Sequence, residues 1–503
     1  MSIPFAAKEH TLYQPDGTQL KVRGWGDQYH AVFETLEGFT VVQDPVSGFY
    51  HYAQLSSDHE DLKPIGMRPG TGDPSLLGIA PGARVTRAAA MAKASEHSGM
   101  PPGNSRWEQR RKQVKERLRL VAQSGGVLAA PPQRTTVGTY IGLCLPVQFP
   151  DVPGTISRQE VDDFCNKAGY TGFGNNGSVR DYFFDNSIGK LTYTSVVAPY
   201  YTAKHPRGYY TNEDVAQPIR ARQLIKEALQ WLKTQNFDFS ALTVDDQHYV
   251  YAVNCFYAGE VSNNWAKGLW PHSYHLQTPL ELMPGKRAYD YQITDFGKEL
   301  TLGTFCHENG HMICDYPDLY DYGDQSNGVG AWCLMCSGPN VSPKNPPQVD
   351  AYLKYKSGWS GQMTTISNGI SAAASATENH YFVHRKSPTE YYIIENRNKA
   401  GRDASLPGSG LAIWHVDETG DQNYEQMAPA QHYELSLVQA DGRNDLEMKV
   451  NNGDATDLYS SPGHTAFSGA TNPASKWWDG TASNLEINAI SAPGPNMTFK
   501  GKL

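Results

Sequence analysis

A short segment in the second half of the chain, His307-Glu308-Asn309-Gly310-His311, has the residue types and spacing of a metal-dependent hydrolase. Residues four apart on a helix lie on one face, so both imidazoles can bind a single metal ion while Glu308 faces its open side. Neutral imidazoles suit zinc, and a carboxylate beside a bound water can accept a proton as that water attacks. The alternative is an amphipathic helix with two surface histidines, because a pattern with three fixed letters also recurs by chance.

The residues after the second histidine indicate how a third ligand reaches the metal. A helix that carries two ligands must end soon afterwards so that the chain can double back, and Pro317 supplies the break. Asp318, eleven residues beyond His307, is the preferred third ligand, and Asp315 and Asp321 are the alternatives. Turn formation or calcium binding explains any one of these aspartates equally well.

Amide hydrolysis also needs a group that stabilises the oxyanion, and the candidates are Tyr320, Tyr322 and His272. Each of them could equally be a packing residue. Met335 suits a turn beneath the metal, although a buried methionine often serves only to fill a core.

Two other clusters of metal-ligating side chains stand out. Asp441, Asp445, Asp454 and Asp457 lie between β-type runs and offer hard oxygen donors for calcium, although polar turns explain them without an ion. Four cysteines near the histidines could form a closed structural zinc site, but a disulfide or buried thiols at the C-x-x-C pair explain them better. These cysteines are Cys306, Cys314, Cys333 and Cys336.

The composition excludes several classes of protein. With 39% hydrophobic and 19% charged residues, the chain of 503 residues is globular and long enough for two to four domains. A net charge of −9 without a long basic face argues against nucleic acid as a partner. No apolar run approaches the ~18 residues needed to span a bilayer, and no secretory signal is visible at the start of the chain. Oligomeric state and compartment stay open.

The order of patterns along the chain predicts an α+β protein in three parts. Residues 1–134 contain short β-type runs separated by turns, then a basic helix over 106–123 and a linker rich in Gly, Ala and Pro. We expect that helix to be solvated. Residues 135–364 contain near-continuous apolar strands at 140–149 and 249–257, helices at 161–167 and 219–232, and the H-E-x-x-H segment. Residues 365–503 read as a mostly antiparallel β domain.

Beyond the H-E-x-x-H segment, the chain resembles the M6 family of metallopeptidases, the immune inhibitor A-like group of zincins. The chain differs from the family at Cys314-Asp315-Tyr316, where family members commonly have a Gly and a segment shorter by one residue. The identity of the third ligand therefore stays open. The shared segments follow the family order and are residues 177–183, 187–191, 270–272, 317–321, 328–335, 395–397, 408–411, 414–417 and 439–442.

The resemblance implies a secreted zinc endopeptidase that acts on proteins and is made as a latent precursor. It implies a zincin-type catalytic domain with a mixed sheet and an active-site helix, preceded by a small β and helix prosegment and followed by a β-rich domain. It makes His307 and His311 zinc ligands and Glu308 the general base. The prosegment would cover the cleft until cleavage near 124–134, with Asp27 as a candidate for the open zinc position.

Two other functions are compatible with the sequence. A non-catalytic binding or adhesion protein could use a zincin scaffold, with its β domain holding a protein or a glycan. A zinc hydrolase could also act on a bond other than a peptide bond. The intact His307, Glu308 and His311 favour the peptidase.

Overall fold

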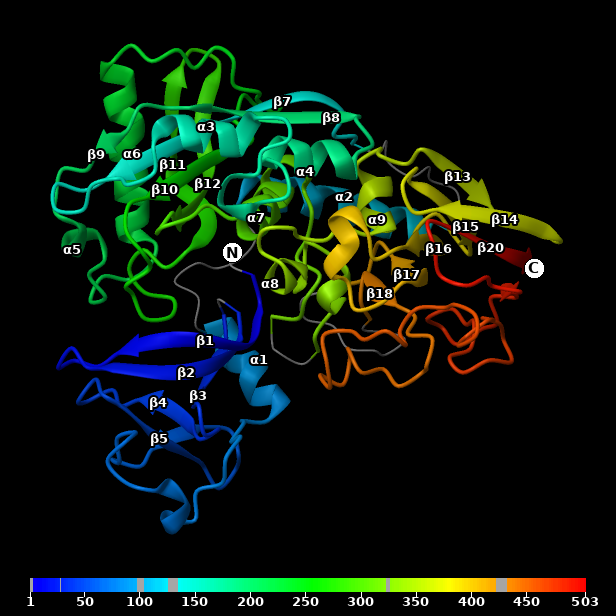
Figure 1. The fold of residues 1–503 in the computed structure, drawn as a ribbon, viewed down its shortest axis with the longest axis horizontal. Helices are drawn as coiled ribbons and strands as arrows, with labels where there is room; N and C mark the ends of the chain where they lie inside the picture. Colours follow the sequence, from blue (N-terminus) through cyan, green and yellow to red (C-terminus); the bar gives the residue numbers. More distant parts are fainter. Residues whose placement is uncertain (1–2, 28, 97–103, 125–133, 323–325, 422–431) are drawn as a thin grey trace.

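The computed structural model describes residues 3–27, 29–96, 104–124, 134–322, 326–421 and 432–503. Within these ranges the fold is α+β, with several sheets and few long helices (Figure 1). The N-terminal sheet, drawn in blue, lies below the green middle region, and the yellow to red C-terminal sheets lie to the right. None of the described helices combines the length and apolarity required to cross a bilayer.

The N-terminal part is an antiparallel sheet followed by two helices, of which the sequence predicted the sheet and the second helix but not α1. Its strands follow the chain in order, and apolar side chains such as Val22, Phe33 and Tyr52 form a small core of its own. The elements are β1 (Phe5–Tyr13), β2 (Gln19–Gly26), β3 (Ala31–Thr35), β4 (Thr40–Gln43), β5 (Tyr50–Leu55), β6 (Leu62–Pro64), η1 (Pro74–Leu77), α1 (Arg87–Glu96) and α2 (Arg106–Gln123).

The middle part is built on a mixed sheet with the order β11-β12-β10-β7-β8, in which β9 also pairs with β7. Its strands are parallel except β11, which runs antiparallel to β12 at the edge. These strands are β7 (Gly138–Gln148), β8 (Leu191–Val197), β9 (Tyr201–Thr202), β10 (Val253–Tyr257), β11 (His272–Met283) and β12 (Lys286–Asp295). The strand predicted at 249–257 begins only at Val253, because Tyr249 and Val250 pair in isolated bridges before it.

Helices cover both faces of this sheet. Alternate residues of β7 point to opposite sides: Leu143 and Leu145 pack with α6, whereas Cys144 joins the core that contains α7. The predicted helices at 161–167 and 219–232 are α3 and α6. The helices of this part are α3 (Arg158–Asn166), η2 (Gly172–Gly174), α4 (Val179–Asn186), α5 (Arg207–Tyr210), α6 (Ile219–Thr234), α7 (Leu302–Cys314), η3 (Gly330–Trp332), α8 (Gly338–Val341) and α9 (Ala351–Lys356).

The C-terminal part consists of two sheets, of order β13-β15-β16-β17-β18 and β14-β20-β19. All pairs are antiparallel except β13 with β15. One buried cluster contains both Trp359 of the middle part and Tyr391 of β16, so the two parts share a core. The elements are β13 (Gln362–Thr365), β14 (Ile370–Ser375), β15 (His380–Arg385), β16 (Glu390–Arg397), η4 (Gly401–Ser405), β17 (Gly410–Asp417), β18 (Leu435–Leu437), β19 (Glu486–Asn488) and β20 (Asn496–Lys502).

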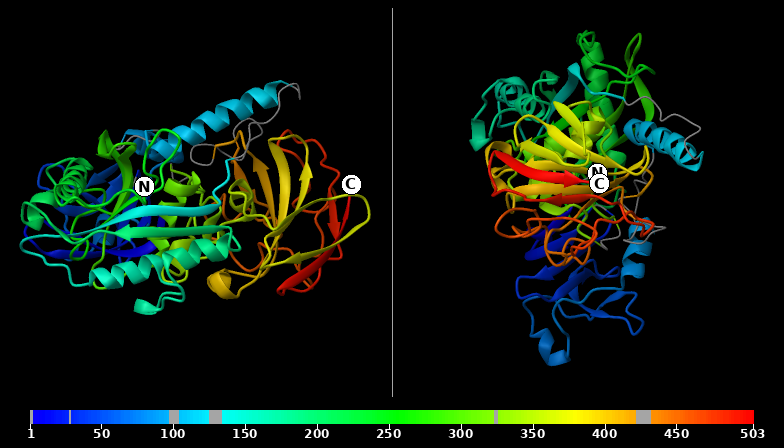
Figure 2. Two further views of the ribbon diagram at one scale, coloured as in Figure 1. Left: turned by 90° about the horizontal axis from the view of Figure 1, so that it is seen from above. Right: turned by 90° about the vertical axis from the view of Figure 1, so that its right-hand side faces the viewer.

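Helix α2 joins the three parts. In Figure 2 it lies along one side of the molecule, from the middle part to the C-terminal sheets. Its first turn is fixed by a capping box, in which Ser105 caps the helix and the Glu108 side chain accepts from the Ser105 N–H at 2.9 Å. The Arg106 N–H donates to Asp290 of β12 at 2.9 Å, so the start of α2 is attached to the middle sheet.

Candidate metal centre

Helix α7 holds the H-E-x-x-H segment at the centre of the molecule. All its residues from Leu302 to Ile313 are buried except Thr304. The helix ends at Cys314 and is capped by Asp315, which has a positive φ of 57°, and the Tyr316 N–H donates back to the Gly310 carbonyl at 3.3 Å. This left-handed residue turns the chain back beneath the helix, and a non-glycine residue in that conformation costs about 1 kcal/mol.

Three side-chain atoms converge on one point beside α7. His307 Nε2 lies 3.0 Å from Asp318 Oδ1, and His311 Nε2 lies 3.3 Å from the same oxygen. The two Nε2 atoms are 3.2 Å apart. All three residues are completely buried, and together they form a group that could hold a metal ion. Of the three aspartates considered from the sequence, Asp318 is the one that joins the histidines.

The spacing of these three atoms fits zinc. Four ligands placed tetrahedrally about 2.0–2.1 Å from a zinc ion lie about 3.3 Å from one another. The observed separations of 3.0, 3.2 and 3.3 Å therefore match one triangular face of such a site and leave the fourth position for water. The donor set of two imidazoles and one carboxylate also suits this metal.

Backbone carbonyls hold both imidazoles in the orientation that this geometry requires. His307 Nδ1 lies 2.9 Å from the Leu334 carbonyl oxygen, and His311 Nδ1 lies 2.7 Å from that of Tyr316. A nitrogen that donates to a carbonyl keeps its proton, so the other ring nitrogen has a free lone pair for a metal. On the third ligand, the Tyr322 hydroxyl donates to Asp318 Oδ2 at 2.7 Å.

The electrostatics of the group also favour a cation. Burial alone would raise the pKa of Asp318, but the two neighbouring imidazoles lower it below its usual range, so the carboxylate stays ionised. Glu308 is 1% exposed, and its charge acts on both His307 and Tyr320. The residue predicted as general base therefore lies beside the metal group without belonging to it.

The structure separates the three candidates for stabilising an oxyanion. The Tyr320 phenol is buried within the electrostatic range of Asp318 and Glu308, so it lies close to the metal group. The Tyr322 hydroxyl is bonded to Asp318. His272 Nδ1 lies 2.7 Å from the Trp270 carbonyl oxygen, and its Nε2 lies 3.1 Å from the Tyr291 hydroxyl. Tyr320 therefore stays a candidate for this role.

The rival aspartates and the predicted methionine have other surroundings. Asp315 accepts from Arg110 and Arg134, and Asp321 lies outside the metal group. Met335 packs beneath the helix at Gly310, where an added Cβ would lie 2.9 Å from its sulfur. The glycine of the motif is therefore needed so that this segment can approach α7 closely.

A buried polar network behind α7 could not be inferred from the sequence. Asn309, between the two histidines, accepts from the Tyr193 hydroxyl at 2.6 Å and donates to Asn254 at 2.9 Å. Gln292 donates to the same Asn254 oxygen at 2.5 Å. These residues link the active-site helix to β8, β10 and β12, so they fix its rotation against the sheet.

Two aromatic residues from the N-terminal part cover the metal group. Trp107 stacks on His311, with ring centroids 4.6 Å apart and planes 23° apart. The ring of Tyr29 lies 4.5 Å from that of Tyr322. Asp27, the candidate for the open metal position, accepts from the Tyr29 N–H at 2.6 Å and lies outside the metal group.

Helix α2 is docked rather than solvated, which corrects the prediction for this basic stretch. Arg110 pairs with Asp315 at 2.7 Å and with Asp245 at 3.1 Å. Arg111 and Lys115 both pair with the buried Glu434 of the C-terminal part. The many charges of this helix suggested a solvent-exposed face. The prediction failed because a helical sequence pattern does not reveal the carboxylates from distant parts of the chain with which these charges pair.

The remaining metal candidates have explanations that need no ion. Asp441, Asp454 and Asp457 hold carboxylate oxygens within 4.8 Å of one another, and Asp445 lies beside them. The Arg443 guanidinium pairs with Asp441 at 2.8 Å, with Asp454 at 2.6 Å and with Asp445 at 3.1 Å, so it offsets part of the negative charge of the cluster. Calcium binding there stays a prediction. Cys306, Cys314, Cys333 and Cys336 are free thiols, and all but Cys314 are buried.

One comparison with known proteins identifies the region around this site. Residues 277–362, which include β12, α7 and the chain through Asp318 and Met335, match the family model described as immune inhibitor A peptidase M6, catalytic domain. No curated protein matches the chain.

Proposed function

We propose that this metallopeptidase, whose residues 277–362 belong to the immune inhibitor A peptidase family, M6, is a zinc-dependent endopeptidase that cleaves protein substrates. The observation that carries the proposal is the triangle formed by His307 Nε2, His311 Nε2 and Asp318 Oδ1, with sides of 3.0, 3.2 and 3.3 Å. These three residues would hold the zinc. When bound, zinc supplies a Lewis acid that makes water nucleophilic near neutral pH.

The side chains around the metal group have separate roles in the proposed reaction. Glu308 accepts the proton of the attacking water on its carboxylate and passes it to the amine of the leaving product. Tyr320 donates its hydroxyl to the oxygen of the scissile carbonyl. Tyr322 and the carbonyls of Leu334 and Tyr316 orient the ligands, since each donates to or accepts from one of them.

We further propose a latent precursor. Residues 1–134 would be an inhibitory prosegment, residues 135–364 a zincin-like catalytic domain and residues 365–503 a β-rich domain. The burial of the metal ligands under Trp107 and Tyr29 supports latency, because a substrate could not reach His311 while Trp107 is stacked on it. Activation by cleavage near 124–134 remains part of the proposal, and residues 125–133 lie outside the described ranges.

The proposal also includes secretion of the protein and binding of calcium. An extracellular location is proposed on the family resemblance, since M6 peptidases are typically secreted. Calcium would bind at Asp441, Asp454 and Asp457 only by displacing Arg443, which now pairs with two of them. A calcium-dependent rise in thermal stability that zinc does not reproduce would support this site.

The test of the proposal uses the full chain after its linker has been cut. We expect stoichiometric zinc, hydrolysis of casein and loss of hydrolysis with a zinc chelator. Glu308→Gln should retain zinc and lose hydrolysis by about 10²–10⁴-fold, because the general base is removed while the ligands stay. Glu486→Gln, which replaces a glutamate on β19, is the matched control.

Three results would count against the proposal. A Glu308→Gln chain that is as active as the wild type would remove the assigned base. A zinc-loaded chain that binds proteins without cleaving them would favour a binding or adhesion protein, and activity on a non-peptide bond alone would favour a different hydrolase.

A further inference from the structure

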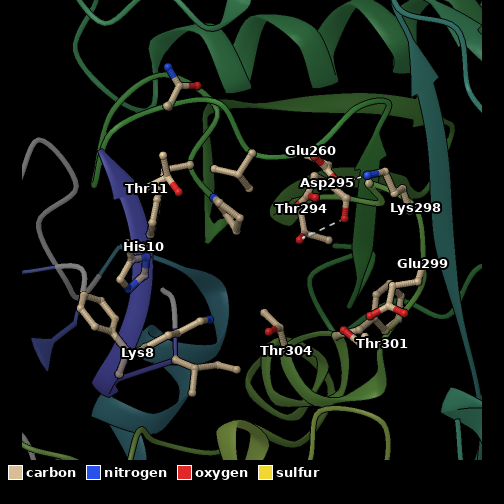
Figure 3. A pocket seen from close by; sticks show the side chains of 18 of the residues that line it. Lys8, His10, Thr11, Glu260, Thr294, Asp295, Lys298, Glu299, Thr301 and Thr304 are labelled. Atoms are coloured by element: carbon tan, nitrogen blue, oxygen red, sulfur yellow. Dashed lines mark hydrogen bonds and ion pairs between the residues drawn. The ribbon is translucent and has the colours of Figure 1, made fainter. Parts of the chain in front are cut away.

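A cavity of about 790 Å³ separates strand β1 from the middle part of the molecule. Figure 3 shows side chains from both sides facing into it. Lys8, His10 and Thr11 come from β1, and Thr294 and Asp295 come from the end of β12. A cavity of this size is within the range of ligand sites in proteins, which measure about 300–1,000 Å³.

The cavity lies against the start of the helix that carries the proposed active site. Its wall includes Thr301, Thr304 and Phe305 at the start of α7, and Trp270 and Pro271 just before the edge strand β11. Thr304 precedes Glu308 by one turn on the same face of the helix, which places it about 5–6 Å from the proposed base. If the prosegment leaves, this cavity becomes an open pocket next to the scissile bond.

Asp295 is the acidic group of this wall without a matching cation. In the described part of the chain no Lys, Arg or His lies within ion-pair distance of Asp295, whereas Glu260 pairs with Lys298 at 3.3 Å. Burial raises the pKa of Asp295 to about 6, and the more distant Arg207 opposes that effect only in part. A carboxyl in this position gains from an added positive charge.

The prosegment already presents such a charge. Lys8 of β1 extends into the cavity in Figure 3, and its ammonium interacts electrostatically with Asp295. His10, two residues after Lys8 on the same strand, packs near Trp270 with ring centroids 5.9 Å apart. This contact holds β1 against the wall of the cavity.

From this arrangement we infer that Asp295 determines substrate specificity, by binding a lysine or arginine side chain of the substrate at one position near the scissile bond. In the latent chain, Lys8 of β1 is the basic side chain that faces this cavity opposite Asp295. The inference rests on the proposed peptidase function and adds a substrate class to it. A carboxylate at the base of a pocket selects a cation because an uncharged side chain leaves its charge unpaired.

The experiment measures cleavage preferences. The full-length chain is folded, cut at a protease site introduced within 125–133, and freed of the prosegment in high salt. It then digests a mixed peptide library, and mass spectrometry reads the residues around each cut. We expect lysine and arginine to be enriched about tenfold at one position, and Asp295→Asn to remove most of that enrichment.

Three further chains complete the design. Asp295→Glu should keep the preference for basic residues, because it keeps the charge. Asp238→Asn, which neutralises an exposed aspartate beyond α6, should cleave with the wild-type preference. In the Glu308→Gln chain, a lysine-containing peptide should bind about tenfold more tightly than the same peptide with norleucine, as measured by fluorescence anisotropy.

The outcomes distinguish this inference from the proposed function. Cleavage without a basic preference at any position, or an unchanged preference in Asp295→Asn, would overturn the role of Asp295 and leave the peptidase intact. If the zinc-loaded wild type cleaves no peptide, the proposed function fails and the inference fails with it.

Discussion

Trp107 lies against His311 with the two ring planes only 23° apart and their centroids 4.6 Å apart. One residue belongs to helix α2 of the N-terminal part and the other to the metal group. The indole is 4% exposed and the imidazole is fully buried. The contact therefore joins the proposed prosegment directly to a proposed zinc ligand, so the stability of this contact should control latency.

The first prediction concerns the substitution Trp107→Ala. Truncating a buried tryptophan costs about 3–5 kcal/mol, and here the loss falls on the docked state of α2. We expect the uncut chain to hydrolyse casein at least tenfold faster than the uncut wild type, because the covered state becomes less populated. The measurement is the initial rate of hydrolysis with zinc present.

Leu120→Ala is the matched control, since Leu120 lies on the same helix and is 57% exposed. It should leave the uncut chain latent. Thermal unfolding of both variants checks that the rest of the chain stays folded. An uncut Trp107→Ala chain that is folded and as inactive as the wild type would show that other contacts suffice for latency.

Much of the metal group could be predicted from the sequence, because it depends on local geometry. The spacing of His307 and His311 is that of one helical turn, and the break at Pro317 made Asp318 the preferred third ligand. The choice between Asp315, Asp318 and Asp321 stayed open, because it depends on the direction of the chain after the helix. That direction is set by Asp315, whose left-handed φ of 57° is not evident from its residue type.

The covering of the site could not be predicted in the same way. The bounds of α2 over 106–123 followed from its pattern. Its partners Asp245 and Asp315 are more than 130 residues away in the sequence. Contacts at such separations depend on the folding of the whole chain, and a single sequence carries no local signal for them.

The second prediction concerns Tyr322, whose hydroxyl donates to Asp318 Oδ2 at 2.7 Å. Removing a hydrogen bond to a metal ligand typically lowers metal affinity by about 10–100-fold. We expect Tyr322→Phe to bind zinc more weakly by that factor, as measured by competition with a chelator of known affinity. At saturating zinc its kcat should change less than its zinc affinity.

Tyr320→Phe should behave in the opposite manner, which makes it the control for Tyr322→Phe. Its hydroxyl is proposed to act on the scissile carbonyl, so its loss should lower kcat by about 10²–10³-fold with zinc affinity near that of the wild type. Equal effects of the two substitutions on both quantities would contradict the separate roles given to these tyrosines.

The third prediction is that acid weakens the docking of α2 through Glu434. Burial would raise the pKa of this carboxyl, but Arg111 and Lys115 lower it to about 2, below its ordinary value of about 4.3. Because the pKa of Glu434 is depressed in the docked state, the stabilising contribution of this carboxylate is fully present above about pH 4.3 and is lost as the pH falls toward 2.

Hydrogen exchange of the α2 amides in the uncut chain, corrected for intrinsic rates, should show protection falling at least tenfold between about pH 5 and 2.5. Glu434→Gln should begin with lower protection at pH 6 and lose less of it on acidification, because it lacks the carboxylate that becomes protonated. The other carboxylates that α2 contacts are common to both chains, so their titration affects both profiles equally. Identical pH profiles for the two chains would mean that Glu434 does not hold the helix in place.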